Sequence, residues 1–400
     1  MAFLHSAAFY LPFLLVITII ITIHELGHFL TAKAFGVAID RFSIGFGRAI
    51  ASWRDRSGVE WRLGWLPLGG YVRFAGDDNA ASIPDRADLE ALRSEIRARE
   101  GVGAERRYLY FKPLWQRTLI VLAGPAANFI LAIALFALFF GLFGQPMTST
   151  RIDQVIAGGA AAKAGFKGGD VLLTADGRPL ESFEDLQFYV QYRAGVPIAF
   201  TVRRAGQVVQ LTAAPGSVQE TSPFGGKEAI GMLGLTARGG FLKHFGPVGS
   251  LVMGAKKTWS VSATTLFYLE RIVTGQVGAD QLHSFVGIAH ASGDITRQAV
   301  EAAHTEKVSV VKATFFFLIQ LTAFLSVSIG LLNLLPIPIL DGGHLIFYGY
   351  EAIAKRPAGA GVQAAGYRVG LALLVGLMLF ATWNDLQRLR VFQFFGSLFS

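Results

Sequence analysis

Residues 16–36, VITIIITIHELGHFLTAKAFG, begin as a membrane-spanning segment and then place three titratable groups directly behind the apolar run. His24, Glu25 and His28 share about one helical turn. A charged side chain at mid-bilayer costs at least about 3 kcal/mol on insertion scales, so these groups need a partner that stabilises them there. A metal ion is such a partner, and the segment therefore predicts a membrane helix that carries a metal site.

The spacing of the three groups suits a catalytic zinc site. An α-helix turns once in about 3.6 residues, so His24 and His28 project from one face and can bind one ion. Glu25 lies on the same side and can take a proton from water and pass it to a leaving amine. Two imidazoles plus one carboxylate form a ligand set of catalytic zinc. The pattern HExxH alone arises by chance in on the order of one per cent of chains of this length, so its position in a membrane segment is what gives it weight.

Composition agrees with a membrane protein. Of the 400 residues 52% are hydrophobic and 16% are charged, which is too apolar for an ordinary soluble enzyme. Four stretches reach the roughly 20 residues that a bilayer requires. With their flanks they predict transmembrane helices at 1–36, 113–146, 313–345 and 360–386. A cleaved signal peptide is the weaker interpretation of the first stretch, because no basic residue precedes it and no small-residue cleavage site ends it.

Basic residues orient the chain. Lys33, Arg41 and further arginines follow the first span and none precedes it, so the positive-inside rule puts the N-terminus outside and 32–117 in the cytoplasm. The metal site then lies in the cytoplasmic leaflet, about 26 Å along the helix from Ala7 in a core of about 30 Å. Four spans return the tail, 387–400, to the outside. The net charge of +8 suits anionic lipid headgroups, and no basic patch indicates nucleic acid. The absence of Cys excludes disulfides and thiolate ligands.

The first connection predicts a β element and a helix. Residues 37–76 alternate as strands about a turn at 55–58, and their apolar part, WLPLGGYV, is expected to reach the membrane interface. Residues 77–112 are charged and predict a cytoplasmic helix with a loop. The AGPAANF motif at the start of the second span offers small-residue surfaces for close helix packing.

The connection 145–312 is too long for a simple loop. Residues 160–190 predict a short helix, a strand, an Asp-Gly turn and a second helix from near Ser182, and a hairpin follows about Ala205-Gly206. This order resembles a bacterial PDZ domain over 150–216, outside the cytoplasm; an unrelated small β domain is the alternative. Residues 217–310 are expected to form a linker and amphipathic helices on the outer membrane face.

A third metal ligand is expected from the third span. This span descends to the cytoplasmic side and ends in NLLPIPILDGGH, 333–344, so Asp341 reaches the depth of His28. The two prolines should loosen the helix, and Gly342-Gly343 should let the backbone turn beneath it. His344 is the rival ligand. Spacing favours Asp341 but does not exclude His344. Four other histidines fall in the outside loop and are expected to be ordinary surface residues: His244, His283, His290 and His304.

Taken together, these motifs resemble the site-2 protease family of intramembrane zinc metalloproteases, and most closely its regulator-of-sigma-E-protease type. HELGH, FSIGFG, LPLGGYV, AGPAANF, the inserted PDZ domain and LDG occur in the family's order along nearly the whole chain. The resemblance implies that His24, His28 and Asp341 bind Zn²⁺ and that Glu25 is the catalytic base. Two features depart from it: one PDZ domain is evident where enterobacterial relatives carry two, and HSFVGIAHASG replaces an expected Gly-Pro motif.

The resemblance also implies where a substrate binds. Asn333 matches a residue that holds extended substrate backbone, with a helix-packing amide as the open alternative. The segment containing Gly69 and Gly70 matches a membrane-entering β element that pairs with an unwound substrate.

The expected fold is a polytopic α-helical membrane protein with about four transmembrane helices, a membrane-associated β-hairpin and an inserted extracytoplasmic PDZ domain, in the bacterial inner membrane. The expected activity is cleavage within the transmembrane segment of a single-pass protein, such as an anti-sigma factor already trimmed by another protease. One alternative is a membrane-anchored zincin acting on cytosolic or misfolded proteins. The other is a non-enzymatic metal-binding scaffold or transporter, which needs no general base, so the substitution Glu25→Gln would separate it from a protease.

Overall fold

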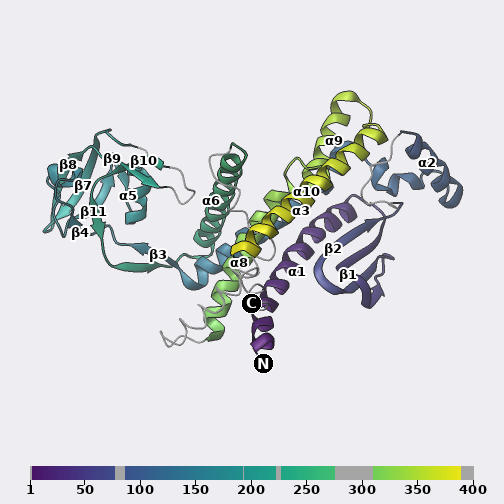
Figure 1. Cartoon of the computed structure of the whole chain (residues 1–400), viewed down its shortest axis with the longest axis horizontal. Helices are drawn as coiled ribbons and strands as arrows, with labels where there is room; N and C mark the ends of the chain where they lie inside the picture. Colours follow the sequence, from purple (N-terminus) through teal and green to yellow (C-terminus); the bar gives the residue numbers. More distant parts are fainter. Residues whose placement is uncertain (1, 77–85, 192, 222–226, 275–309, 389–400) are drawn as a thin grey trace, which may run out of the picture. The chain divides into compact units, whose positions relative to one another are not determined.

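The computed structural model describes residues 2–76, 86–191, 193–221, 227–274 and 310–388 (Figure 1). The chain divides into two compact units. One comprises Met1–Phe139, Leu251–Leu266 and Asp280–Ser400, and the other comprises Phe140–Ser250 and Phe267–Ala279. Apolar helices and one long β-hairpin make up most of the described part of the first unit, whereas short strands dominate the second.

Four helices in the described residues are long and apolar enough to cross a membrane, as the composition predicted. They belong to α1 (Ala2–Ala34), α3 (Leu114–Phe143), α8 (Val310–Asn333) and α10 (Ala360–Arg388). α1 and α8 pack through apolar side chains, with Val16 and Ile20 of α1 buried in one cluster with Leu325 of α8. α3 keeps its helical course through Pro125, which is tolerated in membrane helices because neighbouring groups satisfy the freed carbonyl.

The third span is shorter than predicted, because 313–345 is not one helix. α8 ends at Asn333, and α9 (Asp341–Ala354) begins at Asp341. Pro336 and Pro338 lie between them, and neither can donate the backbone hydrogen bond that a continuing helix needs. Asp341 therefore starts a helix instead of ending the span.

Gly342 and Gly343 do not form the predicted turn but lie in the first turn of α9. A Cβ added at Gly342 would lie 2.5 Å from the carbonyl carbon of Leu334, and one at Gly343 would lie 2.7 Å from that of Ile337. Both distances are shorter than a carbon–carbon contact allows. These glycines thus let α9 pack directly against the backbone that precedes it.

The long hairpin consists of β1 (Ile39–Arg54) and β2 (Glu60–Phe74), which pair antiparallel with several register shifts. Its turn falls at the predicted residues, where the Asp55 carboxylate accepts the backbone N–H of Ser57 at 2.8 Å. α1 lies along β2 (Figure 1). Phe29 of α1 packs edge-on against the rings of Phe42 and Trp61, with 5.3 Å between centroids in each pair. A short helix, α2 (Arg86–Glu100), follows within the predicted 77–112 segment.

The second unit contains a four-stranded antiparallel sheet in the order β6-β5-β7-β8. Its strands are β5 (Val171–Ala175), β6 (Arg178–Pro179), β7 (Ile198–Arg204) and β8 (Gln207–Ala213). The helices α4 (Ala160–Lys163) and α5 (Phe183–Val190) stand at the predicted places. α5 begins with a capping box, in which the Ser182 hydroxyl accepts the backbone N–H of Asp185 and the Asp185 carboxylate accepts that of Ser182.

This unit extends beyond the predicted boundary at residue 216, so 217–246 is not a plain linker. β9 (Gly216–Thr221) and β10 (Lys227–Met232) form a hairpin. β11 (Leu235–Ala237) pairs with β4 (Ile152–Val155), and Leu233 is buried in the same core as Phe200. Further on, β12 (Gly240–Lys243) pairs with β3 (Gln145–Thr148). Both pairings join segments far apart in the chain, which leave no local periodic signal.

One long helix, α6 (Pro247–Val273), occupies the start of the predicted amphipathic region. The rest of that prediction lies outside the described residues. So do the HSFVGIAHASG stretch with His283 and His290, residue His304, and most of the 387–400 tail.

Candidate metal centre

The two histidines of α1 converge as their spacing predicts. The Nε2 atoms of His24 and His28 are 3.2 Å apart, and the rings meet edge to face with 4.8 Å between centroids. His24 is buried and His28 is half-buried. α1 therefore presents two imidazole nitrogens to one point.

Asp341, at the start of α9, completes the group. Its Oδ2 atom is buried and lies 3.1 Å from His24 Nε2 and 3.5 Å from His28 Nε2. Within the described part of the chain, these three residues are the group of His, Asp and Glu side chains that could hold a metal ion, with ligand atoms all within 4.8 Å of one another. His344 is not in that group, and its ring lies 6.0 Å from the ring of Tyr367.

The hydrogen bonding of His28 suits a metal ligand. His28 Nδ1 lies 2.8 Å from the carbonyl oxygen of Ile120, which can only accept, so the proton is on Nδ1. When the ring is neutral, Nε2 directs a lone pair towards the carboxylate of Asp341. Two electron-rich atoms at 3.5 Å then repel each other unless a cation lies between them. A ligand set of two neutral imidazoles and one carboxylate is typical of catalytic zinc.

Glu25 faces the hairpin beside this group. One of its carboxylate oxygens accepts the backbone N–H of Val72 in β2 at 3.2 Å. A Cβ added at Gly70 would lie 3.6 Å from Glu25 Cγ, so the strand passes close to this carboxylate. Gly69, at φ +150°, lies against the ring of Phe46. Of the two sequence-predicted glycines, Gly70 thus lies next to the candidate base and Gly69 lies against Phe46. Asn333 is the last, half-buried residue of α8.

α3 supports the histidines at very short range. A Cβ added at Gly124 would lie 2.5 Å from His28 Cε1 and 2.9 Å from His24 Cε1, so only glycine leaves room for both rings. A Cβ at Gly27 would lie 2.8 Å from the carbonyl carbon of Ala123. The small residues of AGPAANF therefore admit the candidate ligands as well as allowing close helix packing.

Two supporting interactions were missed by the sequence reasoning. The fully buried Asn128 of α3 contacts His24 Nδ1 at 3.3 Å. This residue belongs to the AGPAANF motif, from which only close helix packing was predicted. Arg117 of α3 pairs with Glu351 of α9 through two contacts of 2.5 and 3.1 Å, and it lies 5.1 Å from the ring centroid of Tyr348. This ion pair joins α3 to the helix that begins with Asp341. Its partners are too distant in sequence for any local pattern to reveal it.

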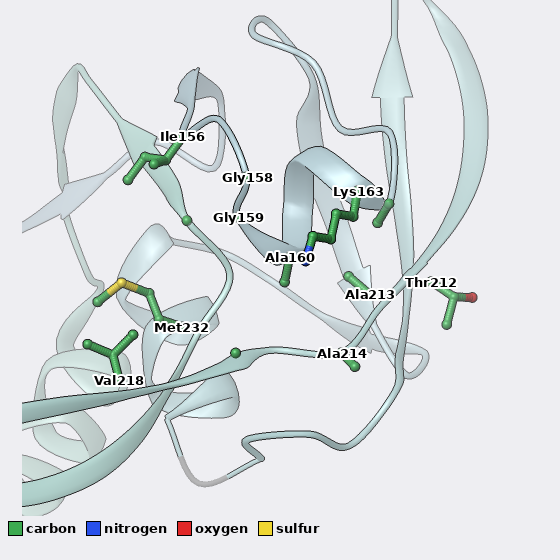
Figure 2. Close-up of a pocket in the computed structure, with 13 residues that line it drawn as sticks. Ile156, Gly158, Gly159, Ala160, Lys163, Thr212, Ala213, Ala214, Val218 and Met232 are labelled. Atoms are coloured by element: carbon green, nitrogen blue, oxygen red, sulfur yellow. The ribbon is translucent and has the colours of Figure 1, made fainter.

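The second unit contains a separate cavity of about 550 Å³ (Figure 2). Figure 2 shows Gly158 and Gly159 leading into α4, with Val218 and Met232 on strands across the cavity. Its lining is mostly small and apolar, and Lys163 is the charged residue among the lining residues. Such a lining can hold an apolar group but offers no acid–base pair for catalysis.

Comparison with known proteins agrees with the site. The sequence profile of Peptidase family M50 matches residues 12–377. "Metalloprotease MmpA" of Caulobacter vibrioides is 52% identical over 390 residues, which is 97% of each chain. "Putative zinc metalloprotease Atu1380" of Agrobacterium fabrum is 41% identical over 382 residues, and "Putative zinc metalloprotease R01501" of Rhizobium meliloti is 38% identical over 378. Each alignment to these two covers 94% of this chain and 95% of the relative.

Four observations indicate the same family. They are a profile match over most of the chain, relatives aligned nearly end to end, four apolar helices and a His-His-Asp group. The chain belongs to Peptidase family M50, the site-2 protease family, and is a zinc metalloprotease of the membrane.

Proposed function

We propose that this protein cleaves a peptide bond within the transmembrane segment of a single-pass membrane protein. The main support is that two of the three candidate metal ligands lie within a helix apolar enough to span a membrane. His24 and His28 lie on the apolar span Phe13–Ala34, where a water-soluble substrate would have to enter lipid to reach them. The assignment of the family as metalloproteases favours this function over a non-enzymatic metal-binding protein.

In this proposal, His24, His28 and Asp341 hold the zinc ion. When bound, zinc supplies Lewis acidity at the scissile carbonyl and makes a water molecule acidic enough to attack near neutral pH. Glu25 takes the proton of the attacking water and returns it to the leaving amine. The Val72 N–H bond to Glu25 orients the carboxylate for this transfer.

The substrate segment must be extended when it is cut. A helical peptide bond is shielded, and its carbonyl already accepts a hydrogen bond. The segment around Gly69 and Gly70 offers strand backbone with no side chain beside Glu25, so an unwound substrate can add to it by β-augmentation. Asn333 would hold the far side of the substrate backbone. The exposed apolar side chains of this hairpin, among them Trp65 and Leu68, suit contact with lipid.

Four arms of one experiment test the reaction. Purified protein in liposomes is given single-pass substrates whose transmembrane segments contain helix-destabilising residues, and cleavage and bound zinc are measured for wild type, Glu25→Gln and Asp341→Asn. Glu25→Gln should keep zinc and lose about 10²–10⁴ in rate, whereas Asp341→Asn should lose zinc. A soluble unfolded protein forms the fourth arm, since a zincin acting on misfolded proteins would cut it. Cleavage by Glu25→Gln at the wild-type rate would refute the assigned mechanism.

We further propose that the second unit is a PDZ domain on the periplasmic side of a bacterial inner membrane, where it excludes substrates that another protease has not yet trimmed. An anti-sigma factor is the type of substrate expected. The order of β4, α4, β5 and α5 supports the domain assignment. Replacing residues 150–237 by a flexible linker should allow cleavage of an untrimmed substrate, and an unchanged preference for trimmed substrate would contradict the filter.

A further inference from the structure

Asn128 of α3 is a buried amide whose two ends are unequally satisfied. Its side chain is fully buried, and its Nδ2 atom lies 3.3 Å from His24 Nδ1. Its Oδ1 atom is also buried and has no hydrogen-bond partner. The two ends of an amide group have nearly the same shape, so the hydrogen-bond network decides which end faces the histidine.

The orientation of this amide determines which nitrogen of His24 is protonated. If Nδ2 donates to His24 Nδ1, the ring proton must be on Nε2, the atom that lies 3.1 Å from Asp341 Oδ2. A protonated Nε2 cannot bind a metal ion. With the amide turned over, Oδ1 accepts the Nδ1–H of His24, and Nε2 directs its lone pair towards Asp341 and His28.

His28 already has the arrangement that the turned amide would give His24. Its Nδ1–H donates to the carbonyl oxygen of Ile120, which leaves Nε2 free. Ile120, Gly124 and Asn128 follow one another at intervals of four residues and therefore lie on one face of α3. Gly124 makes room for the rings. Four residues before it, the backbone oxygen of Ile120 accepts from His28, and four residues after it, the turned side chain of Asn128 would accept from His24.

Asn128 is also held in place from its other side. Ser326 of α8 donates a hydrogen bond to the backbone carbonyl of Asn128 at 2.8 Å. A Cβ added at Gly330 would lie 3.2 Å from Asn128 Cβ, so α8 packs closely here. The backbone that carries the amide is therefore held at a fixed place beside His24.

We propose that Asn128 is a positioning residue, which accepts a hydrogen bond from His24 Nδ1 through Oδ1 and so keeps Nε2 of His24 free to bind zinc. The proposal rests on the assignment of His24, His28 and Asp341 as ligands. Groups that orient metal ligands in this way typically contribute 10–100-fold to metal affinity.

The test measures zinc affinity by competition with a chromophoric chelator, using the full-length protein in detergent. Asn128→Leu, which has a similar size but no acceptor, should bind zinc about 10–100-fold more weakly. Asn128→Asp, which keeps an acceptor in the same place, should bind within about threefold of wild type or more tightly. Gln363→Met is the matched control; it removes a buried amide of α10, whose Nε2 donates to the carbonyl oxygen of Ala358, and it should bind zinc normally.

Two outcomes would overturn the proposal: wild-type affinity in Asn128→Leu, or an equal loss in Asn128→Asp. Thermal unfolding with and without a chelator separates folding from binding, because only the zinc-induced rise in Tm should shrink. If Asn128→Leu does not fold, Asn128→Ala and Asn128→Asp provide the same comparison. Failure of the ligand assignment itself would be recognised separately, since His24→Ala would then retain tight zinc binding.

Discussion

Adding one methyl group at Gly124 should weaken zinc binding without unfolding the protein. The new Cβ would lie 2.5 Å from His28 Cε1 and 2.9 Å from His24 Cε1, whereas carbon atoms in contact normally stay about 3.5–4.0 Å apart. The rings or the helices must therefore separate by about 1 Å. His28 cannot move freely, because its Nδ1 atom donates a hydrogen bond to the carbonyl oxygen of Ile120 at 2.8 Å. His24 is buried beside Asn128.

The size of the effect follows from overpacking. Forcing an extra methyl into a packed site costs about 1–3 kcal/mol. If that cost falls on the zinc-bound arrangement, affinity drops by about 5–150-fold, since about 1.4 kcal/mol is tenfold. Ala is favoured over Gly by about 0.8–1 kcal/mol within a helix, so the metal-free protein should keep nearly its wild-type stability.

The assay compares Gly124→Ala with Gly141→Ala, a substitution on the same helix. At Gly141 an added Cβ would lie 3.3 Å from the Ser250 hydroxyl, which can rotate away. Zinc affinity by chelator competition and Tm with and without chelator are measured for both variants. Gly124→Ala should show a smaller zinc-induced rise in Tm and slower proteolysis at limiting zinc, and Gly141→Ala should keep both at the wild-type level. Wild-type zinc affinity in Gly124→Ala would show that the rings do not occupy the positions described.

Three further predictions concern the surroundings of the site and the second unit. Arg117→Met leaves the carboxylate of Glu351 unpaired in a largely buried place, so it should destabilise the protein by about 3–5 kcal/mol; the double variant Arg117→Met/Glu351→Met should lose less, which denaturant unfolding would show. Gly342→Ala would press on the backbone of Leu334 and displace Asp341, so zinc affinity should fall, whereas Gly349→Ala, with no atom within 4 Å of the added Cβ, should leave it unchanged. Arg204 holds the pKa of Asp170 below its usual range through hydrogen bonds of 2.8 Å, so this pair stabilises the fold above the unfolded pKa of about 3.9, and the gain is lost as pH falls through the lower folded value. Asp170→Asn should lower Tm at pH 7, and the difference from wild type should shrink in acid; a constant difference would contradict the pairing.

Much of the helical framework follows from the sequence, because the signals are local. The apolar length of each span, the i, i+4 spacing of His24 and His28, and the glycines at the hairpin turns all act within a few residues of the chain. Even so, local signals did not show where the third helix ends, because the two prolines could either kink or stop it. They also left 217–246 as a linker, because β11 and β12 pair with strands far away.

By itself, the sequence determined that two imidazoles and a carboxylate would share one turn of a membrane helix, since helical periodicity depends only on neighbouring residues. Spacing and the family resemblance favoured Asp341 over His344, and the structure places Asp341 beside that pair. The tertiary structure alone decided that Gly124 admits the two rings and that Ile120 and Asn128 contact their outer nitrogens. Those contacts depend on the register of α1 against α3 and on the break between α8 and α9. Register between helices is set by side-chain packing across the whole interface, and no short stretch of sequence records it.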